Sequence, residues 1–146
     1  MEKALVTGAD RGLGLAFTDL LLQEGWEVFA GQYMPGEPSL AELARKFPDR
    51  LHIIPLDVSS DESVDRALAT VSGMTDRLNL IANIAGIMAS TVVDAEVRDS
   101  MTGDGTIFDP MHSDALLRLF NVNTLGPMRV TNRFVNLLLK GDGDRT

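Results

Sequence analysis

Thr7-Gly8-Ala9-Asp10-Arg11-Gly12-Leu13-Gly14 lies between a short apolar run and a segment with helical periodicity. The run at residues 4–6 predicts a buried strand, and residues 12–24 predict a helix. Glycines at such a junction let the backbone turn sharply, and they let a phosphate group approach main-chain N–H groups at the positive end of the helix. The spacing Gly-x-x-x-Gly-x-Gly is not that of a P-loop. It predicts a phosphate-binding turn, with a strand-turn-helix unit that binds nothing as the alternative.

Apolar runs and helix-period segments alternate along the rest of the chain, which is typical of β-α-β units around a parallel sheet. Further strands are expected at residues 27–30, 51–54 and 78–82. Three further helices are expected: one N-capped by Ser39, one N-capped by Ser60 or Asp61, and one over Ser113–Lys140 with an interruption near Gly126-Pro127. The pattern predicts an α/β fold with a doubly wound parallel sheet in three layers, α/β/α, that stops after the fourth strand and the long helix.

The first helix is expected to bury one apolar face, formed by Leu13, Ala16, Phe17, Leu20 and Leu21. The connection between the fourth strand and the long helix, residues 88–112, is long and polar. Connections of that length inside a compact domain are usually functional or mobile. This one is therefore expected to shape access for a substrate or a partner.

Charge and composition exclude several classes of function. The 146 residues carry 21 Asp and Glu against 13 Lys and Arg, so an acidic single domain with no basic stripe is not expected to bind nucleic acid. The chain has no cysteine, and its two histidines, His52 and His112, lie far apart, so no metal site is expected. No apolar stretch approaches the roughly 20 residues of a membrane span, which favours a cytoplasmic protein without membrane contact.

Three further motifs follow the glycine turn along the chain. Asp57-Val58 follows the third expected strand, Asn83-Ile84-Ala85-Gly86 follows the fourth, and Asn121-Val122-Asn123 lies in the long helix. Together with the glycine turn, which resembles the signature Thr-Gly-x-x-x-Gly-x-Gly, these motifs resemble in order those of the short-chain dehydrogenase/reductase family. Ile84 is a departure, since the family has a second Asn there. The resemblance implies a Rossmann-like NAD(P)-binding domain, and the long helix with the loop before it also resembles the branch typified by the C-factor signalling proteins.

The resemblance implies a set of cofactor-binding residues: Thr7, Gly8, Asp10, Arg11, Gly12, Leu13, Gly14, Gln32, Asp57, Val58, Asn83, Ala85 and Gly86. It also implies that the Asp57 carboxylate meets the adenine amino group and that Asn123 is the asparagine of the family's catalytic tetrad. Each of these has a purely structural alternative. Asp57 could be a turn residue, Asn83 could tie strands together, and Asn123 could stabilise a kink, because Asn competes with helical hydrogen bonding.

The end of the second strand bears on the choice of cofactor. NAD enzymes usually have an acidic residue there that holds the ribose hydroxyls, whereas this chain has no carboxylate between Ala30 and Glu37. Arg11 matches the basic residue of family members that prefer NADP, where a guanidinium can pair with the 2′-phosphate. NADP is therefore expected to be preferred over NAD.

The family's hydride transfer uses a Ser, a Tyr and a Lys four residues after the Tyr, and these are missing here. The only tyrosine is Tyr33, and Glu37 stands four residues later. Because a positioned acid contributes about 10²- to 10⁴-fold to such catalysis, residues 1–146 alone are expected to have little turnover. The first hypothesis is the cofactor-binding half of an oxidoreductase for small carbonyl or alcohol substrates. Alternatives are a non-catalytic NAD(P)-binding module and an unrelated hydrolase or structural domain.

The fourth strand also predicts how the chain associates. Residues 78–82 are apolar and would form an open edge of the sheet. An open apolar edge predicts a homo-oligomer, or association with another polypeptide through that edge.

Overall fold

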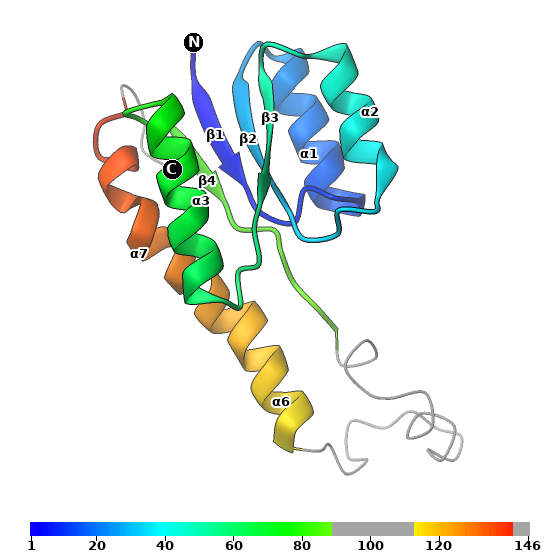
Figure 1. Ribbon diagram of the computed structural model, residues 1–146, viewed down its shortest axis with the longest axis vertical. Coiled ribbons are helices and arrows are strands. Elements are labelled where there is room, and N and C mark those ends of the chain that lie inside the picture. Colours follow the sequence, from blue (N-terminus) through cyan, green and yellow to red (C-terminus); the bar gives the residue numbers. More distant parts are fainter. Residues whose placement is uncertain (89–112, 142–146) are drawn as a thin grey trace.

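The computed structural model describes residues 1–88 and 113–141, so most of the predicted polar connection, residues 89–112, lies outside the described residues. Four parallel strands form one sheet: β1 (Lys3–Val6), β2 (Glu27–Gln32), β3 (Leu51–Pro55) and β4 (Leu80–Ala82). Their order is β3-β2-β1-β4, so the chain moves outward from β1 to β3 and then returns to the other side of β1 (Figure 1). This is the predicted doubly wound topology.

Helices cover both faces of the sheet. One face carries α1 (Gly12–Gln23) and α2 (Pro38–Lys46), and the other carries α3 (Asp61–Met74) and α7 (Gly126–Leu138) (Figure 1). Strand side chains alternate between the two apolar cores: Leu5 and Phe29 pack under α3 and α7, whereas Val6 and Ala30 pack under α1 and α2. The three-layer α/β/α architecture is confirmed.

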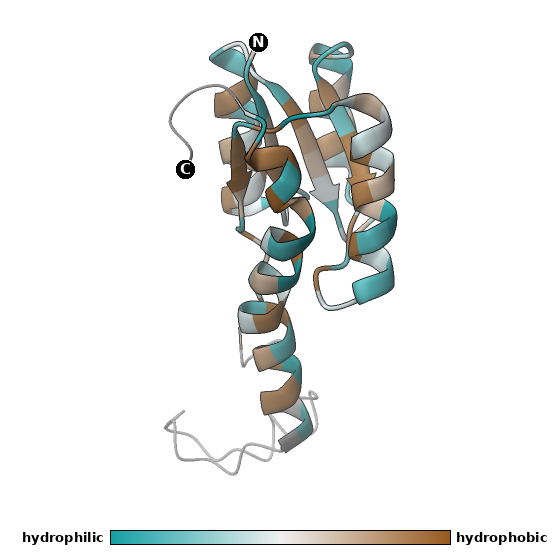
Figure 2. Ribbon diagram, turned by 90° about the vertical axis from the view of Figure 1, so that its left-hand side faces the viewer, coloured by the Kyte–Doolittle hydropathy of each residue, from teal (hydrophilic) through white to brown (hydrophobic). Residues whose placement is uncertain are grey.

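The long helix predicted over Ser113–Lys140 has three parts: α6 (Ser113–Phe120), the π-helical turn η1 (Asn121–Leu125) and α7. The predicted interruption at Gly126-Pro127 follows directly on η1. At Gly126 the helix approaches the loop after β3 so closely that a Cβ would lie 2.9 Å from Val58 Cγ2. Figure 2 shows the long helix extending past the end of the sheet. Two hydrogen bonds between Asn123 of η1 and the main chain of Ile87 place η1 beside the segment that follows β4.

The buried face of α1 differs from the prediction. Three residues of the predicted face are exposed: Leu13, Ala16 and Leu20. The inward face consists of Gly14, Thr18, Leu21 and Leu22. The helix is apolar around most of its circumference, so periodicity could not single out one side. Its orientation follows instead from Gly14, whose missing side chain lets the helix contact the turn before it.

Element boundaries also differ in detail. The N-cap of α2 is Glu37, not Ser39, and its Oε1 accepts hydrogen bonds from the Ser39 N–H at 3.4 Å and the Ser39 hydroxyl at 2.8 Å. Of the two candidates for α3, the N-cap is Ser60, which accepts from the Ser63 N–H at 3.2 Å. The strand β4 begins at Leu80, two residues later than predicted. Within the described ranges, no helix is both long and apolar enough to cross a membrane.

Candidate functional site

A cavity of about 430 Å³ opens at the carboxyl ends of the strands. Its walls come from the glycine turn after β1, residues 33–34 after β2, residues 56–59 after β3, residues 84–87 after β4, and the long helix. The chain leaves β1 toward β2, and β4 returns on the opposite side of β1. Open α/β sheets bind ligands in the crevice at such a reversal of strand order.

Two glycines with left-handed backbone conformation shape the turn at the cavity. Gly8 has φ 65° and Gly12 has φ 53°, a region that favours glycine. A Cβ on Gly8 would lie 2.7 Å from Ala85 Cα, so this glycine allows β1 and the segment after β4 to come together. A Cβ on Gly12 would meet no described heavy atom within 4 Å. The turn is therefore closed on the Gly8 side and open at Gly12.

The first turn of α1 fits an anionic ligand. Arg11 is the N-cap residue, and its side chain makes no hydrogen bond to the helix. The first turn contains no acidic residue, so the positive end of the helix is not neutralised from within. Main-chain N–H groups at a helix start without such a cap are available to phosphate oxygens. These residues therefore fit the diphosphate of a dinucleotide.

Asp10 lines the cavity, but its carboxylate is already engaged. One oxygen accepts from the Tyr33 N–H and the other from the Met34 N–H, both at 3.0 Å. The residue is 4% exposed. Asp10 thus fixes the end of β2 against the glycine turn, and its charge is paired with backbone donors.

Thr7 ties the end of β1 to the end of β4. Its hydroxyl accepts from the N–H groups of Ile84 and Ala85, both at 3.0 Å, and it donates to the Ala82 carbonyl at 3.4 Å. These three bonds use the full hydrogen-bonding capacity of a hydroxyl group. Thr7 is buried and does not line the cavity, so its role in the structure is to hold the cavity wall formed by residues 84–87.

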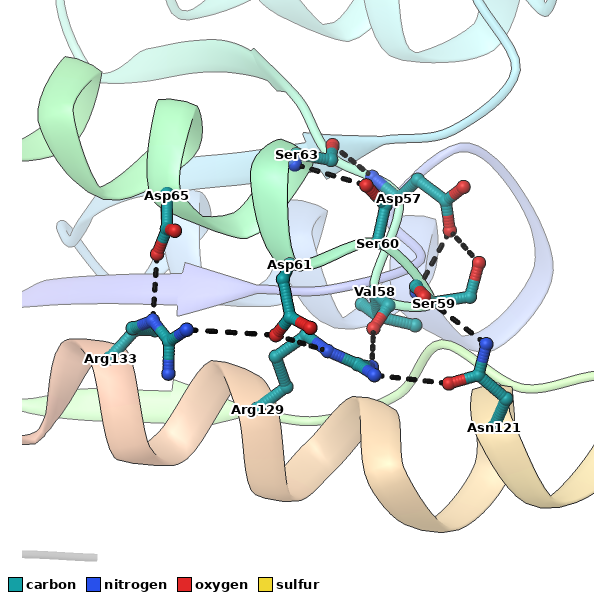
Figure 3. A network of polar contacts seen from close by, with 10 residues as sticks. All are labelled: Asp57, Val58, Ser59, Ser60, Asp61, Ser63, Asp65, Asn121, Arg129 and Arg133. Carbon is teal, nitrogen blue, oxygen red and sulfur yellow. Dashed lines mark hydrogen bonds and ion pairs between the residues drawn. The ribbon is translucent and has the colours of Figure 1, made fainter.

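Asp57 is a turn residue at the edge of the cavity. Its Oδ1 closes the turn after β3 by accepting from the Ser59 N–H at 2.9 Å and the Ser59 hydroxyl at 2.6 Å (Figure 3). Its Oδ2 accepts no hydrogen bond from a described residue, and Asp57 lines the cavity. The residue is therefore a turn residue with one carboxylate oxygen left for a ligand donor such as an amino group.

Two asparagines join the segment after β4 to the long helix. Asn123 in η1 accepts from the Ile87 N–H at 2.9 Å and donates to the Ile87 carbonyl at 2.8 Å. Asn83 donates to the Thr131 hydroxyl at 3.1 Å. Asn83 thus joins the segment after β4 to α7 and not to a neighbouring strand, and the Asn123 pair places η1 against the cavity wall.

Most of the site residues expected from sequence come together at the cavity: Gly8, Asp10, Arg11, Gly12, Leu13, Gly14, Asp57, Val58, Ala85 and Gly86. The expected residues that do not line it are Thr7, Gln32, Asn83 and Asn123. Lining residues that sequence reasoning did not assign are Tyr33, Met34, Leu56, Ser59, Ile84, Ile87, Arg118 and Val122. Tyr33 and Met34 directly follow Gln32, the residue predicted to bind the cofactor at this end of β2. Arg118 lies in the long helix outside any motif, so no sequence signal pointed to it.

A parallel sheet with a glycine turn at the reversal of strand order defines a dinucleotide-binding domain of the Rossmann type. Residues 2–145 match the family described as short chain dehydrogenase. The chain is 34% identical over 143 residues to short-chain dehydrogenase fogD of Aspergillus ruber, covering 96% of this chain and 43% of that protein. It therefore belongs to the short-chain dehydrogenase/reductase family.

Solved structures agree with this assignment. The NADPH-bound carbonyl reductase from chicken fatty liver superimposes with a TM-score of 0.77 at 30% identity, covering 96% of this chain and 52% of that one. A short-chain dehydrogenase/reductase from Burkholderia multivorans with bound NADP gives 0.74 at 28% identity, covering 93% and 53%. The chain thus spans about half the length of these relatives.

Proposed function

We propose that this chain binds NAD(P) in the cavity and forms the cofactor-binding half of an oxidoreductase for small carbonyl or alcohol substrates. The observation that carries the proposal is the open, uncapped start of α1 at Gly12, inside a cavity that also contains the Asp57 carboxylate. The first N–H groups of α1 would bind the diphosphate, and Asp57 Oδ2 would accept from the adenine amino group. When bound, the nicotinamide would supply or accept the hydride.

We propose that NADP is preferred over NAD. The end of β2 has no carboxylate between Ala30 and Glu37, and the Asp10 carboxylate, which lies beside this strand end in space, accepts hydrogen bonds from backbone N–H groups with both of its oxygens. Arg11 and Arg118 are exposed and line the cavity, so two guanidinium groups are available to a phosphate. The solved relatives named above carry NADPH or NADP, which supports the same choice.

We propose further that residues 1–146 bind the cofactor without appreciable turnover. Asn123 is the one residue of the family's catalytic tetrad that this sequence matches. Residues 1–146 contain no Tyr-x-x-x-Lys. The same observation favours the second candidate function, a non-catalytic NAD(P)-binding module that acts through a partner. A Tyr-x-x-x-Lys encoded downstream of Thr146 would favour the oxidoreductase half, and its absence there would favour the module.

Fluorescence titration of residues 1–146 with NADPH, NADH and ADP tests the proposal. We expect saturable binding of all three, with NADPH tighter than NADH, and no reduction of an aromatic aldehyde above the uncatalysed rate. Absence of saturable binding would overturn the assignment of the cavity. Equal affinity for NADPH and NADH would overturn the cofactor preference, and efficient aldehyde reduction would overturn the expectation of a half without turnover.

A further inference from the structure

Arg129 of α7 contacts three separate segments next to the cavity (Figure 3). Its Nη1 donates to the Val58 carbonyl at 2.6 Å, its Nη2 to Asn121 Oδ1 at 3.1 Å, and its Nε to Asp61 Oδ1 at 2.8 Å. Its side chain is 12% exposed. A guanidinium with its donors committed in several directions fixes the relative positions of its partners, because its planar geometry is rigid.

Asn121 provides a second link between the same two segments. It is the first residue of η1, and its Nδ2 donates to the Ser59 carbonyl at 3.2 Å while its Oδ1 accepts from Arg129. The carbonyls of Val58 and Ser59, adjacent in the chain, therefore bind Arg129 and Asn121 respectively. This closed arrangement joins the loop after β3, which includes Asp57, to the π-helical turn.

The π-helical turn is the part of the long helix that most needs such ties. A π-turn is rare and is less favourable than continued α-helix, so contacts outside the helix have to hold it. Asn121 and Asn123 belong to this one turn, and Asn123 holds the main chain of Ile87 through two hydrogen bonds. A displacement of η1 would therefore change the position of both Asn123 and the cavity wall at Ile87.

We propose that Arg129 is a positioning residue that holds the loop 57–59 and the turn η1 in one arrangement. Through the loop it sets Asp57 for the adenine, and through Asn121 it sets Asn123 against Ile87. The adenine part rests on the proposed function. The Asn123 part does not, because it concerns hydrogen bonds present in this chain without a ligand.

Arg133 is a matched control on the same helix. Its Nε pairs with Asp65 at 2.7 Å and its Nη2 lies 3.6 Å from Asp61, and its side chain is 40% exposed. It shares the acidic partner Asp61 with Arg129, yet among the described residues it contacts neither Val58 nor Asn121. Arg133→Ala therefore removes the same charge from α7 and leaves the loop and η1 tied together.

The experiment compares wild type, Arg129→Ala, Arg129→Lys and Arg133→Ala by amide hydrogen exchange and by calorimetric titration with ADP. In Arg129→Ala we expect exchange of the Ile87 amide to rise at least ~10-fold relative to the Val28 amide of β2, and ADP affinity to fall at least ~5-fold. Arg129→Lys should recover little, since one ammonium group cannot serve the Val58 carbonyl and Asn121 with the same geometry. Arg133→Ala should change neither quantity.

Each outcome decides a separate point. Unchanged Ile87 exchange and ADP affinity in folded Arg129→Ala would overturn the inference, as would equal acceleration at Ile87 and Val28, which would indicate a purely structural role. If wild type binds no ADP but Ile87 exchange still responds, the proposed function fails and the positioning role stands. If Arg129→Ala does not fold, Asn121→Ala tests the Asn123 part of the inference, because it removes the acceptor of the Arg129 bond to η1 and leaves the Arg129 bond to Val58 in place. Ile87 exchange is expected to rise there too, and an unchanged rate would overturn the inference.

Discussion

Gly12 and Gly14 stand two residues apart in the turn, but side chains at these positions would meet different surroundings. A Cβ on Gly14 would overlap the Gly8 carbonyl oxygen, so the fold itself requires glycine there. A Cβ on Gly12 would project into open space, and only its φ of 53° favours glycine. Substitution at Gly14 therefore tests folding, whereas substitution at Gly12 tests ligand binding.

For Gly12→Val we expect NADPH affinity to fall at least ~10-fold, about 1.4 kcal/mol, because the new side chain occupies the approach to the start of α1. Gly25→Val is the matched control, since Gly25 also has positive φ, at 89°, and open space around it, but does not line the cavity. Both variants should lose about 1–2 kcal/mol of stability to backbone strain. Fluorescence titration should show weaker NADPH binding in Gly12→Val alone. Equal affinity in the two variants would contradict the assigned diphosphate position.

Single residues also show where sequence reasoning reached its limit. The motifs located the glycine turn, Asp57 and Ala85 at one cavity because strands of a parallel sheet end at a common edge. They could not show that the two Asp10 carboxylate oxygens accept hydrogen bonds from the Tyr33 and Met34 N–H groups, because those bonds depend on where β2 ends. A motif gives the type of residue at each position. The hydrogen-bond partners of that residue depend on the backbone around it, which the motif does not describe.

At the level of elements, strands were predictable because their short apolar runs are bounded by turn residues. The orientation of α1 was not, because its small residues Gly14 and Thr18 set its approach to the sheet more than its exposed leucines do. Gly126-Pro127 predicted the position of the break in the long helix, but nothing in the sequence predicted that the break is a π-helical turn. That form depends on hydrogen bonds between Asn121 or Asn123 and segments distant in sequence.

A charged cluster joins the first three strands at the end of the sheet opposite the cavity. Glu27 of β2 pairs with Lys3 Nζ at 2.9 Å and His52 Nε2 at 3.0 Å, and the Glu27 side chain is 11% exposed. Burial acts to raise the pKa of Glu27, but hydrogen bonds and charge from Lys3 and His52 together outweigh it. The pKa of Glu27 is therefore lowered from its ordinary value of 4.5.

This cluster predicts a pH-dependent contribution to stability. A carboxylate whose pKa is lowered by folding stabilises the protein fully above its unfolded pKa, and that contribution is lost as pH falls through the folded pKa. We expect Glu27→Gln to lose about 1 kcal/mol at neutral pH and to approach wild type in acid. Urea unfolding from about pH 6 to about pH 3 measures the difference. Glu24→Gln is the control, because Glu24 is exposed. If the loss of unfolding free energy in Glu27→Gln stayed constant as the pH fell to about 3, the role of the Glu27 carboxylate would be contradicted.

At the scale of the whole molecule, the described residues leave apolar surface uncovered. Among the described residues, β4 pairs with β1 and with no strand on its other side. Exposed apolar side chains also occur along the long helix, including Leu117, Phe120 and Met128. A strand edge with free backbone groups is a template for pairing with another chain, and apolar surface beside it favours association. We propose that residues 1–146 self-associate through the open edge of β4.

Sedimentation velocity over a wide concentration range should show a mass that rises above the 15.8 kDa of one chain. Hydrogen exchange should locate the contact, because strand pairing gives new partners to those amides of Leu80–Ala82 that point away from β1, and the exchange of these amides should slow as concentration rises. Phe120→Ser removes exposed apolar surface from α6 and leaves the edge intact, so the slowing at β4 should persist in this variant. A single-chain mass at every concentration would refute self-association. Loss of association in Phe120→Ser, with β4 exchange independent of concentration, would move the interface from the strand edge to the long helix.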